Sequence, residues 1–473
     1  MLKDAEPATR PRAFALASRG ALRASAARDA GALLLLAVLV NVAYLGSKSL
    51  DYDECGSAAY ARLGPLALVK TIVRDDPNMA IYYVVLNVWA RIFGESDAVL
   101  RVPSALFGAG AVAAIYLVGR RLFGRTAGLI AGVLLALNPF MVRYAQTARA
   151  YSLLVLLVTL SSCAFVRAIE SPSASNGVGY AITSMLSVLA HFFAVFVLAA
   201  HALTLVVLKR RAALTREWLH VTAPILLSSA VVALLTYGSR GASRINWIQP
   251  ASLTDIGKVL VDLSGRRWIL LLVLLLGGGY AAARAWWEPR SWGVGFVTAW
   301  LLVPVALSFL VSLVKPMFLS RYLIICVPAL ILFGVCGIVR LRPPMVAVAV
   351  AALLAGVSVT GLLRLYSGEP PENWREAARY VLAATRAGDG IVFVPDYARR
   401  PFAYYGRQLH LTEPVNVTGK HFADSPRIWV VTRKADVAAR PSELGRLRAS
   451  LSESFRLAAE RSFPGIGITL YVR

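Results

Sequence analysis

Three acidic residues, Asp51, Asp53 and Glu54, follow directly after the first long apolar run of this chain. The whole chain carries a formal net charge of +24, and charged side chains close to hydrocarbon are costly unless they are paired or functional. A carboxylate at a membrane face could take a proton from an acceptor hydroxyl as that oxygen attacks a substrate. Because adjacent residues on a helix do not face each other, we expect one of Asp53 and Glu54 to face the substrate. The other would orient it, or bind an amine or a metal ion.

The same residues have a simpler interpretation, in which a solvated loop contains an Asp that caps a helix. The spacing alone gives the two interpretations equal weight. In both of them we expect Asp51 to be the helix cap or a residue that supports the acidic pair.

A second acidic segment, Asp75-Asp76-Pro77-Asn78, precedes the apolar stretch 79–93. Asp76 or Asn78 could cap that stretch, and Pro77 suits a turn. The functional alternative is that the two acidic segments flank a reacting centre, or hold a divalent cation through oxygen ligands. The spacing is a weak indication of a metal site, so a divalent cation is the one cofactor left open and none is assigned.

Basic residues occur at two helix ends on the outer side, where the positive-inside bias disfavours them. The polar turn 143–151 contains Arg143 and Arg149, and another turn contains Lys315 and Arg321. Guanidinium groups bind phosphate through paired hydrogen bonds, so these residues could hold a lipid phosphate and stabilise its charge as it leaves. The alternative is that their side chains extend to lipid headgroups.

Histidine and aromatic side chains lie near the same helix ends. His191 falls between two apolar runs on the outer side, where a lone His is more often a hydrogen-bonded residue between helices. His201 is expected to face the apolar interior and to have no chemical role. Tyr82 and Tyr83 are expected to anchor at the membrane interface, although a sugar could also stack on such rings.

The composition indicates which elements must position these residues. Of the 473 residues, 58% are hydrophobic, which predicts a polytopic membrane protein. Much of the Lys and Arg flanks the apolar runs, as the positive-inside rule expects, so the positive charge does not indicate nucleic-acid binding. The basic arm 1–30 is predicted to be cytoplasmic and retained, so that a first helix at about 31–47 runs outward.

The loop 48–102 then lies outside the cytoplasm, and its segment 79–93, too short for a span, is predicted to be an interfacial helix. This choice places basic turns such as 119–125 and 209–211 on the cytoplasmic side. The outer loop 238–267 could cover a site. In total the chain is predicted to have roughly eleven transmembrane helices. After the first, they are expected at about 103–119, 127–142, 152–168, 178–190, 192–208, 219–237, 268–283, 293–314, 321–339 and 344–363.

The composition changes from about residue 367 onward. A helix is predicted at 373–384, and strands are predicted at 391–394, 428–431 and 468–472. These elements indicate a small α/β domain outside the membrane. The chain therefore divides into the basic arm 1–30, a transmembrane module 31–366 and an extracytoplasmic α/β domain 367–473.

Several short motifs occur along the chain in the order Asp53-Glu54, Asp76-Pro77-Asn78, Ile81-Tyr82-Tyr83, Leu100-Arg101-Val102-Pro103-Ser104-Ala105-Leu106-Phe107-Gly108, Gly119-Arg120-Arg121-Leu122-Phe123-Gly124, Arg143-Tyr144-Ala145-Gln146-Thr147-Ala148-Arg149-Ala150-Tyr151-Ser152 and His191-Phe192-Phe193. This ordered set resembles the bacterial GT-C membrane glycosyltransferases of the protein mannosyltransferase and aminoarabinose transferase type (glycosyltransferase family 39). The resemblance is good over about 31–210. It is thinner afterwards, where Ser320-Arg321-Tyr322-Leu323 and 374–380 still look similar.

The resemblance implies a GT-C fold and an inverting transfer of a sugar from a polyprenyl-phosphate-linked donor. The acceptor would be a hydroxyl of an envelope lipid, polysaccharide or protein, on the outer face of the bacterial cytoplasmic membrane. In that family the acidic residue of the first loop is the catalytic base, which here is Asp53, with Glu54 beside it. We expect Arg149 and Arg321 to hold the leaving phosphate, with Arg143 as a further candidate. The candidate substrate-binding residues are Asp76, Asn78, Tyr82, Arg143, Arg149, Tyr151, His191, Arg321 and Tyr322.

One departure from the family pattern concerns the sugar. Many relatives have a His or Lys and a double Pro before the Tyr pair, where this chain has Asn78-Met79-Ala80. The sugar and any metal contact therefore do not carry over from the family.

Two other functions are alternatives to the enzyme. A transporter or flippase of lipid-linked sugars predicts charged residues near the midplane of the spans and broken helices. A scaffold for an envelope assembly predicts that the first-loop carboxylates are dispensable. The predicted spans contain few carboxylates, and the acidic residues gather at one membrane face, which favours the enzyme.

Overall fold

The computed structural model describes residues 10–207, 216–240, 248–285, 292–410, 415–416, 422, 424–439 and 441–473. The predicted basic turn 209–211, and Arg244 and Trp247 of the predicted outer loop, lie outside the described residues, as do the side chains of the basic arm before Ala24. The chain divides into two compact units. The first unit contains Met1–Asn41, Ala105–Ala145 and Tyr151–Leu362, and the second contains Val42–Ser104, Gln146–Ala150 and Leu363–Arg473.

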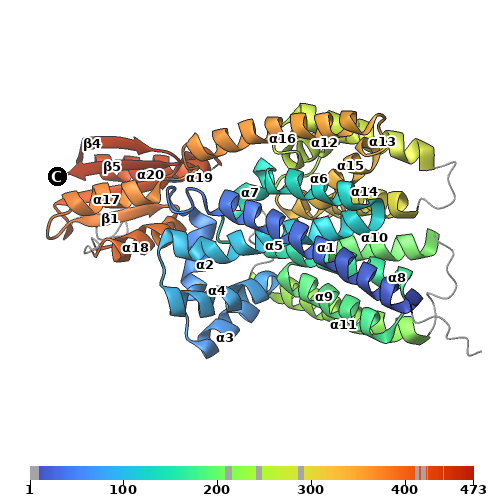
Figure 1. Ribbon diagram of the computed structural model, residues 1–473. Helices are drawn as coiled ribbons and strands as arrows, with labels where there is room; N and C mark the ends of the chain where they lie inside the picture. Colours follow the sequence, from blue (N-terminus) through green and yellow to red (C-terminus); the bar gives the residue numbers. More distant parts are fainter. Residues whose placement is uncertain are drawn as a thin grey trace, which may run out of the picture. The chain divides into compact units, whose positions relative to one another are not determined.

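The first unit is helical, and Figure 1 shows its helices α8, α9 and α11 packed side by side. Apolar runs form these helices because the backbone N–H and C=O groups of a segment in hydrocarbon must hydrogen-bond to each other. The helices that contribute to this unit are α1 (Arg10–Val42), α5 (Asp97–Phe123), α6 (Arg125–Ala136), α7 (Pro139–Ala145), α8 (Tyr151–Glu170), α9 (Ala174–Ala190), α10 (Ala194–Val207), α11 (Arg216–Gly238), α12 (Leu253–Leu263), α13 (Trp268–Ala285), α14 (Trp292–Ser312), η4 (Tyr322–Cys326), α15 (Val327–Ile338) and α16 (Pro344–Ser367).

Each predicted span coincides with helical residues, but the count of eleven is not confirmed. Seven of the described helices are long and apolar enough to cross a membrane, or up to eight if one bent pair is a single span. The segments predicted at 178–190, 192–208 and 321–339 form helices shorter than that length. The first helix ends at Val42 rather than near 47, and the predicted loop 238–267 contains the helix α12.

The span predicted at 127–142 is broken, with α6 and α7 meeting at an angle of 61°. The Asn138 side chain accepts a hydrogen bond from the backbone N–H of Met141 (2.9 Å). The proline that opens α7 has no N–H with which to continue the preceding helix. A polar residue followed by proline therefore starts a new helix inside an apolar run, and hydropathy alone does not register this break.

Small residues let two helices of this unit approach closely. A Cβ atom on Gly337 of α15 would clash with the backbone oxygen of Gly277 in α13. A Cβ atom on Gly334 would likewise meet the backbone of Leu274. Close backbone packing of this kind is a common means of helix association in membranes, where water supplies no hydrophobic driving force.

The second unit combines short helices with a five-stranded sheet whose order is β2-β1-β3-β5-β4. The first three strands in that order are parallel, and the last two join in antiparallel fashion. The strands are β1 (Gly390–Val394), β2 (Val415–Asn416), β3 (Arg427–Arg433), β4 (Arg456–Phe463) and β5 (Ile466–Val472). The helices are α2 (Tyr52–Ala61), α3 (Pro65–Asp75), η1 (Pro77–Met79), α4 (Ala80–Phe93), α17 (Trp374–Ala384), η5 (Asp396–Ala398), α18 (Arg399–Gln408), α19 (Lys434–Ala439) and α20 (Pro441–Ser452).

The structure confirms the predicted helix at 373–384 and the three predicted strands. The edge strand β4 was not predicted, because its side chains are mostly exposed and polar and show no apolar alternation. The residues of the predicted first loop and the residues from Leu363 onward fall in one compact unit. The acidic cluster of the first loop is therefore best understood from its contacts with this C-terminal region.

Candidate active site

The first acidic segment begins helix α2. The Asp51 side chain accepts a hydrogen bond from the backbone N–H of Glu54 (2.8 Å), and the Glu54 carboxylate accepts one from the backbone N–H of Asp51 (3.1 Å). This reciprocal pair is a capping box, which satisfies two N–H groups that a helix start leaves open. The prediction that Asp51 is a helix cap is confirmed.

Glu54 forms a buried ion pair with Arg101, a residue of the motif at 100–108 for which the sequence predicted no role in the site. Only 3% of Glu54 and 5% of Arg101 is exposed. The Arg101 Nε–Oε1 distance is 2.7 Å and the Nη2–Oε2 distance is 2.6 Å. This bidentate arrangement is the strongest geometry for a guanidinium and a carboxylate.

Both partners of this ion pair are saturated with hydrogen bonds. The remaining donors of Arg101 bind the backbone oxygens of Leu45, Lys48 and Ser49, so all five of its N–H groups are used. Glu54 also accepts from the backbone N–H of Ala148 (2.8 Å). Because four donors already bind the Glu54 carboxylate, it has little capacity left to accept a proton from a substrate. Its contacts instead join the start of α2 to Arg101 and Ala148.

Asp53 lies in the same first turn of α2 but is half-buried rather than enclosed. It is the member of the acidic pair that solvent reaches. Asp51, next to it, lies among several carboxylates: burial, followed by the charges of Glu54 and Asp53, raises the pKa of Asp51 to about 7. The start of α2 thus concentrates acidic groups with Asp53 on its accessible side.

Residues of the C-terminal region hold the start of α2 in place. The carboxylate of Glu372 accepts hydrogen bonds from the backbone N–H of Tyr52 (3.0 Å) and from the indole of Trp374 (2.6 Å). Its other oxygen accepts from Arg433 (2.7 Å), and the Arg433 guanidinium stacks over the Tyr52 ring at 5.1 Å. The residue before Asp53 is thereby fixed through both its backbone and its ring.

A second buried acid, Asp97, also connects the segment before α2 with the C-terminal region. It accepts hydrogen bonds from the hydroxyls of Tyr404 (3.0 Å) and Tyr405 (2.6 Å) and from Arg375 (2.6 Å). The Tyr405 hydroxyl also accepts from the backbone N–H of Leu50 (2.7 Å). Helices α17 and α18 thus fix the residues just before the acidic cluster, which no local pattern in the sequence indicates.

The second acidic segment does not cap the helix that follows, which corrects the prediction. No side-chain cap occurs at η1 or α4. Instead the Asp76 carboxylate accepts from the Tyr83 hydroxyl (2.7 Å), which in turn accepts from the Arg149 guanidinium (3.2 Å). Burial raises the pKa of Tyr83 well above its usual value, so its hydroxyl keeps its proton. Asn78 lies half-buried in η1.

Tyr82 and Tyr83 are not interfacial anchors, contrary to the prediction. Their exposed fractions are 0% and 1%. Tyr82 shares a hydrogen bond with Ser104 (2.9 Å), and Tyr83 stacks on Tyr60 with ring centroids 4.1 Å apart. Both rings pack inside the second unit because α4 buries one face against α2, so a direct sugar-stacking role does not fit them.

The segment that carries Arg149 is attached directly to the acidic cluster. The backbone N–H of Ala148 binds Glu54, as described, and the Ser104 hydroxyl donates to the backbone oxygen of Arg149 (3.2 Å). Asp53 and Arg149 are each one residue away from the Glu54–Ala148 hydrogen bond. Within the second unit, the backbone segments that carry Asp53 and Arg149 are therefore joined, and both residues are half-buried.

The remaining candidates form one row of rings within the first unit. Successive ring centroids are 5.0 Å apart for Tyr144 and Tyr151, 6.2 Å for Tyr151 and His191, and 5.4 Å for His191 and Tyr322. Guanidinium groups lie at both ends: Arg143 is 6.0 Å from the Tyr144 ring, and Arg321 is 5.4 Å from the Tyr322 ring. The sequence motifs contain these residues in separate segments, and the fold places their rings next to one another.

Both histidines are buried and hydrogen-bonded, so the prediction of a purely apolar environment for His201 is wrong. His191 is buried, ends helix α9, and accepts a hydrogen bond on Nδ1 from the backbone N–H of Phe193 (3.2 Å). His201 is buried between Ser162 (3.0 Å) and the Tyr180 hydroxyl (3.1 Å). Among the described residues there is no group of three or more His, Cys, Asp or Glu side chains that could hold a metal ion. The divalent-cation alternative therefore gains no support from the geometry.

Residues 75–235 match the family model of the dolichyl-phosphate-mannose-protein mannosyltransferases. The chain is 31% identical over 154 residues to the Bacillus subtilis (strain 168) protein "Putative mannosyltransferase YycA", a match that covers 29% of this chain. The matched stretch spans about a fifth (22%) of the length of that relative.

Two solved structures share the fold. ArnT from Cupriavidus metallidurans, bound to undecaprenyl phosphate, superposes with a TM-score of 0.62 at 14% identity, over 93% of this chain and 97% of that one. The oligosaccharyltransferase AglB from Archaeoglobus fulgidus, in complex with an inhibitory peptide and a dolichol-phosphate, superposes with a TM-score of 0.50 at 13% identity, over 93% and 74%. The family model and the Bacillus relative thus support the resemblance inferred from the motifs, and the chain shares its multi-helix fold with these two solved structures.

Proposed function

We propose that this chain, which shares the GT-C fold and matches the protein mannosyltransferase family model over 75–235, is an inverting membrane glycosyltransferase. It moves a hexosyl or pentosyl group from a polyprenyl-phosphate donor to a hydroxyl of an envelope lipid, polysaccharide or protein. The reaction takes place on the outer face of the bacterial cytoplasmic membrane. Lipid carriers of the same class occur in the two similar solved structures, since the ArnT structure contains undecaprenyl phosphate and the AglB structure a dolichol-phosphate.

The observation that carries this proposal is the difference in burial between Asp53 and Glu54. Glu54 is buried and accepts hydrogen bonds from Arg101 and from backbone N–H groups, whereas Asp53 is half-buried in the same helical turn. In our proposal Asp53 accepts the proton of the acceptor hydroxyl as that oxygen forms a bond to the anomeric carbon. The bond from that carbon to the donor phosphate breaks at the same step, and inversion follows from attack on the opposite face.

The leaving group is a phosphate monoester that gains negative charge, which requires cationic donors. Arg149 is our first candidate, because its guanidinium is held by the Tyr83 hydroxyl while its residue stays half-buried. Arg143 and Arg321, at the two ends of the ring row, are the further candidates. Of the three candidates in the ring row, Tyr322 is half-buried and can offer its face to a sugar, whereas the buried rings of Tyr151 and His191 would hold it in position. Asp76 positions Arg149 through Tyr83.

The matches reported above give no support to the transporter alternative, because the named relatives are transferases. The broken span at Asn138 is a feature that a transporter would share. However, that break is accounted for by a local cap and a proline, so it does not favour transport by itself.

The test is lipid mass spectrometry on envelopes from a strain lacking the gene, complemented with wild type, Asp53→Asn or Glu376→Gln. Glu376 is the matched control, because it also lies in the first turn of a helix but forms an exposed pair with Arg379. We expect the polyprenyl-phosphate sugar to accumulate without the gene and with Asp53→Asn, with transfer reduced by about 10²–10⁴-fold. Glu376→Gln should restore transfer. Full complementation by Asp53→Asn would remove Asp53 as the base, and absence of any accumulated lipid would overturn the proposed donor.

A further inference from the structure

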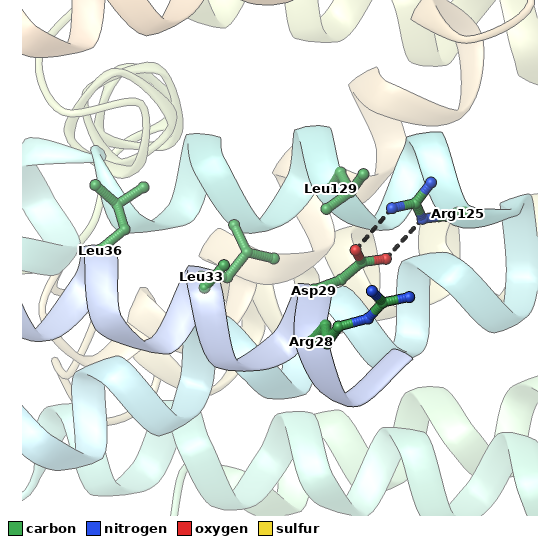
Figure 2. Close-up of a pocket in the computed structure, with 7 residues that line it drawn as sticks. Arg28, Asp29, Leu33, Leu36, Arg125 and Leu129 are labelled. Carbon is green, nitrogen blue, oxygen red and sulfur yellow. Dashed lines mark hydrogen bonds and ion pairs between the residues drawn. The ribbon is translucent and has the colours of Figure 1, made fainter. Parts of the chain in front are cut away.

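A groove lies between α1 and α6 in the first unit, among residues to which the proposed reaction assigns no role. Its volume is about 510 Å³. Figure 2 shows Arg28 and Asp29 of α1 and Arg125 of α6 at one end of it, with Leu33, Leu36 and Leu129 along its walls. The groove therefore has a charged end and an apolar length.

The charged end has a positive balance. Arg125 donates two hydrogen bonds to the Asp29 carboxylate (2.7 and 2.8 Å), and the Tyr116 hydroxyl donates a third (2.7 Å). Arg120 lies 3.7 Å from the same carboxylate. Asp29 is thus already neutralised by its neighbours, and the exposed guanidinium of Arg28 is an additional positive charge beside it. An anion at this end would meet the guanidinium groups of Arg28 and Arg125 and the neutralised carboxylate of Asp29.

Arg125 is also unusual in its place on the helix. It is the first residue of α6, where no acidic side chain occurs in the first turn and the preceding Gly124 supplies no side-chain cap. A positive charge at a helix N-terminus opposes the helix dipole. The Asp29 carboxylate offsets part of this cost, and a second anion near the helix start would interact with both the dipole and the guanidinium.

The position of the groove along the helices indicates which anion fits. Arg28 lies near the start of the candidate span Ala24–Val42, and Arg125 begins the helix pair that forms another. Both guanidinium groups therefore fall at the level expected for lipid headgroups. Leu36 lies eight residues further along α1, roughly 12 Å away at 1.5 Å per residue, which is toward the hydrocarbon. The groove thus changes from cationic to apolar in the direction in which a phospholipid changes from headgroup to acyl chain.

We propose that this groove binds one bilayer phospholipid with an anionic headgroup. Its phosphate contacts Arg28 and the outward edge of Arg125, and one acyl chain follows Leu33, Leu36 and Leu129. The charge bias of the sequence predicts that this end of the helices faces the cytoplasm, the leaflet side on which anionic lipids attract basic residues. A free phosphate would use the charged end alone and leave the apolar walls without a partner.

The experiment is native mass spectrometry of the full chain in detergent, titrated with dioleoyl phosphatidylglycerol or, in parallel, dioleoyl phosphatidylcholine. We expect phosphatidylglycerol to bind more tightly to wild type. Arg28→Gln should weaken that binding about fivefold, the effect of one basic residue near an anionic lipid. Ala32→Phe, at an exposed position in the groove wall, should also weaken it because the new ring fills the apolar length without changing any charge.

Arg364→Gln is the matched control, since Arg364 is an exposed arginine near the end of the candidate span Pro344–Ser367 and outside the groove. It should leave the binding unchanged. Equal binding of the two lipids, or equal weakening by Arg28→Gln and Arg364→Gln, would overturn the proposal in favour of general surface attraction. Displacement of phosphatidylglycerol by equimolar glycerol phosphate would also overturn it, because the site would then recognise a headgroup alone.

Discussion

The Glu54 carboxylate receives two N–H groups from Arg101, one from Ala148 and one from Asp51. Its neighbour Asp53 shares the same turn and the same chemical class but stays accessible. At the scale of the residue, the two acids therefore differ in burial: Glu54 is enclosed by its donors, and Asp53 is half-buried. Glu54 was a catalytic candidate by sequence, and its contacts make it a positioning residue in our proposal.

The first prediction concerns the Glu54–Arg101 pair. Glu54→Gln leaves the Arg101 charge buried without its partner, and breaking a buried pair in this way costs about 3–5 kcal/mol. The detergent-purified variant should therefore unfold at a clearly lower temperature than wild type. Asp53→Asn, at an accessible position, should unfold close to the wild-type temperature.

A double-mutant cycle identifies the cause of that loss. Glu54→Gln combined with Arg101→Gln should destabilise the chain by less than the sum of the two single changes, because both remove the same interaction. Additive losses would show that the two residues act separately.

The second prediction concerns pH. The pKa of Asp51 is about 7 in the folded chain, above the ordinary value of 3.8. Between these values the folded chain binds the proton that the unfolded chain releases, so the contribution of Asp51 to stability falls as pH rises from about 4 to about 7. Asp51→Asn keeps the helix cap but removes this dependence.

The measurement is the unfolding temperature of wild type and Asp51→Asn between pH 4.5 and pH 8. We expect the decline over this range to be shallower in Asp51→Asn. Asp396→Asn, at an exposed position, is the control and should keep the wild-type slope. An unchanged slope in Asp51→Asn would mean that other groups set the pH dependence.

At the scale of the element, helices α17 and α18 act as a support for the start of α2. Arg375 binds Asp97 (2.6 Å) and the backbone oxygen of Gly46 (3.0 Å), and Tyr405 binds the backbone N–H of Leu50 (2.7 Å). These contacts fix a short segment without regular structure that precedes Asp53. Burial and the charge of Asp97 raise the pKa of Tyr405 far above its usual range, so its hydroxyl keeps a proton to donate.

The third prediction follows from this support. Arg375→Gln removes the charge pair with Asp97 and weakens the hold on the backbone near Gly46, so residues 43–62 should open more readily. Hydrogen exchange measured by mass spectrometry should show faster exchange in that stretch. Arg379→Gln, on the same helix but in an exposed ion pair, should leave it unchanged.

Sugar transfer by Arg375→Gln should fall through kcat more than through KM, because the base is mispositioned while donor contacts remain. Wild-type exchange rates together with normal transfer would show that α17 does not position the acidic cluster.

At the scale of the whole molecule, the number of membrane crossings sets the side on which each part works. Seven described helices meet the length expected of a span, and an eighth is formed if the bent pair counts as one, whereas the apolar runs of the sequence predicted roughly eleven. Helices such as α10 (Ala194–Val207) are apolar but short. An odd number of crossings would place the two ends of the chain on opposite sides.

The fourth prediction tests that arrangement with single reporter cysteines. The native cysteines are all buried, so a membrane-impermeant maleimide should leave them unlabelled. Ser442→Cys, exposed in α20, should be labelled in intact spheroplasts. Ser175→Cys, exposed near the start of α9 and predicted to be cytoplasmic, should be labelled only after permeabilisation. Labelling of both under the same condition would contradict the predicted topology.

The sequence by itself determined the helical segments of the membrane part, the Asp51 cap and the central strands β1, β3 and β5. These depend on local patterns: apolar length, a polar residue before a helix, and short β-branched runs. It also placed Asp53, Arg149, Tyr151 and His191 in an order that a known family shares. Local patterns failed where the local signal was absent, as in the exposed edge strand β4.

Only the tertiary structure decided that Glu54 is buried in an ion pair and that Asp53 is half-buried. Arg101 is 47 residues from Glu54, and Asp97 is 308 residues from Tyr405. No pattern within a window of sequence marks such partners, because their pairing depends on how separate helices pack and on which polar groups that packing buries. A buried charge must find its counterion wherever the fold provides one, and that requirement turned an acidic pair into one structural residue and one candidate base.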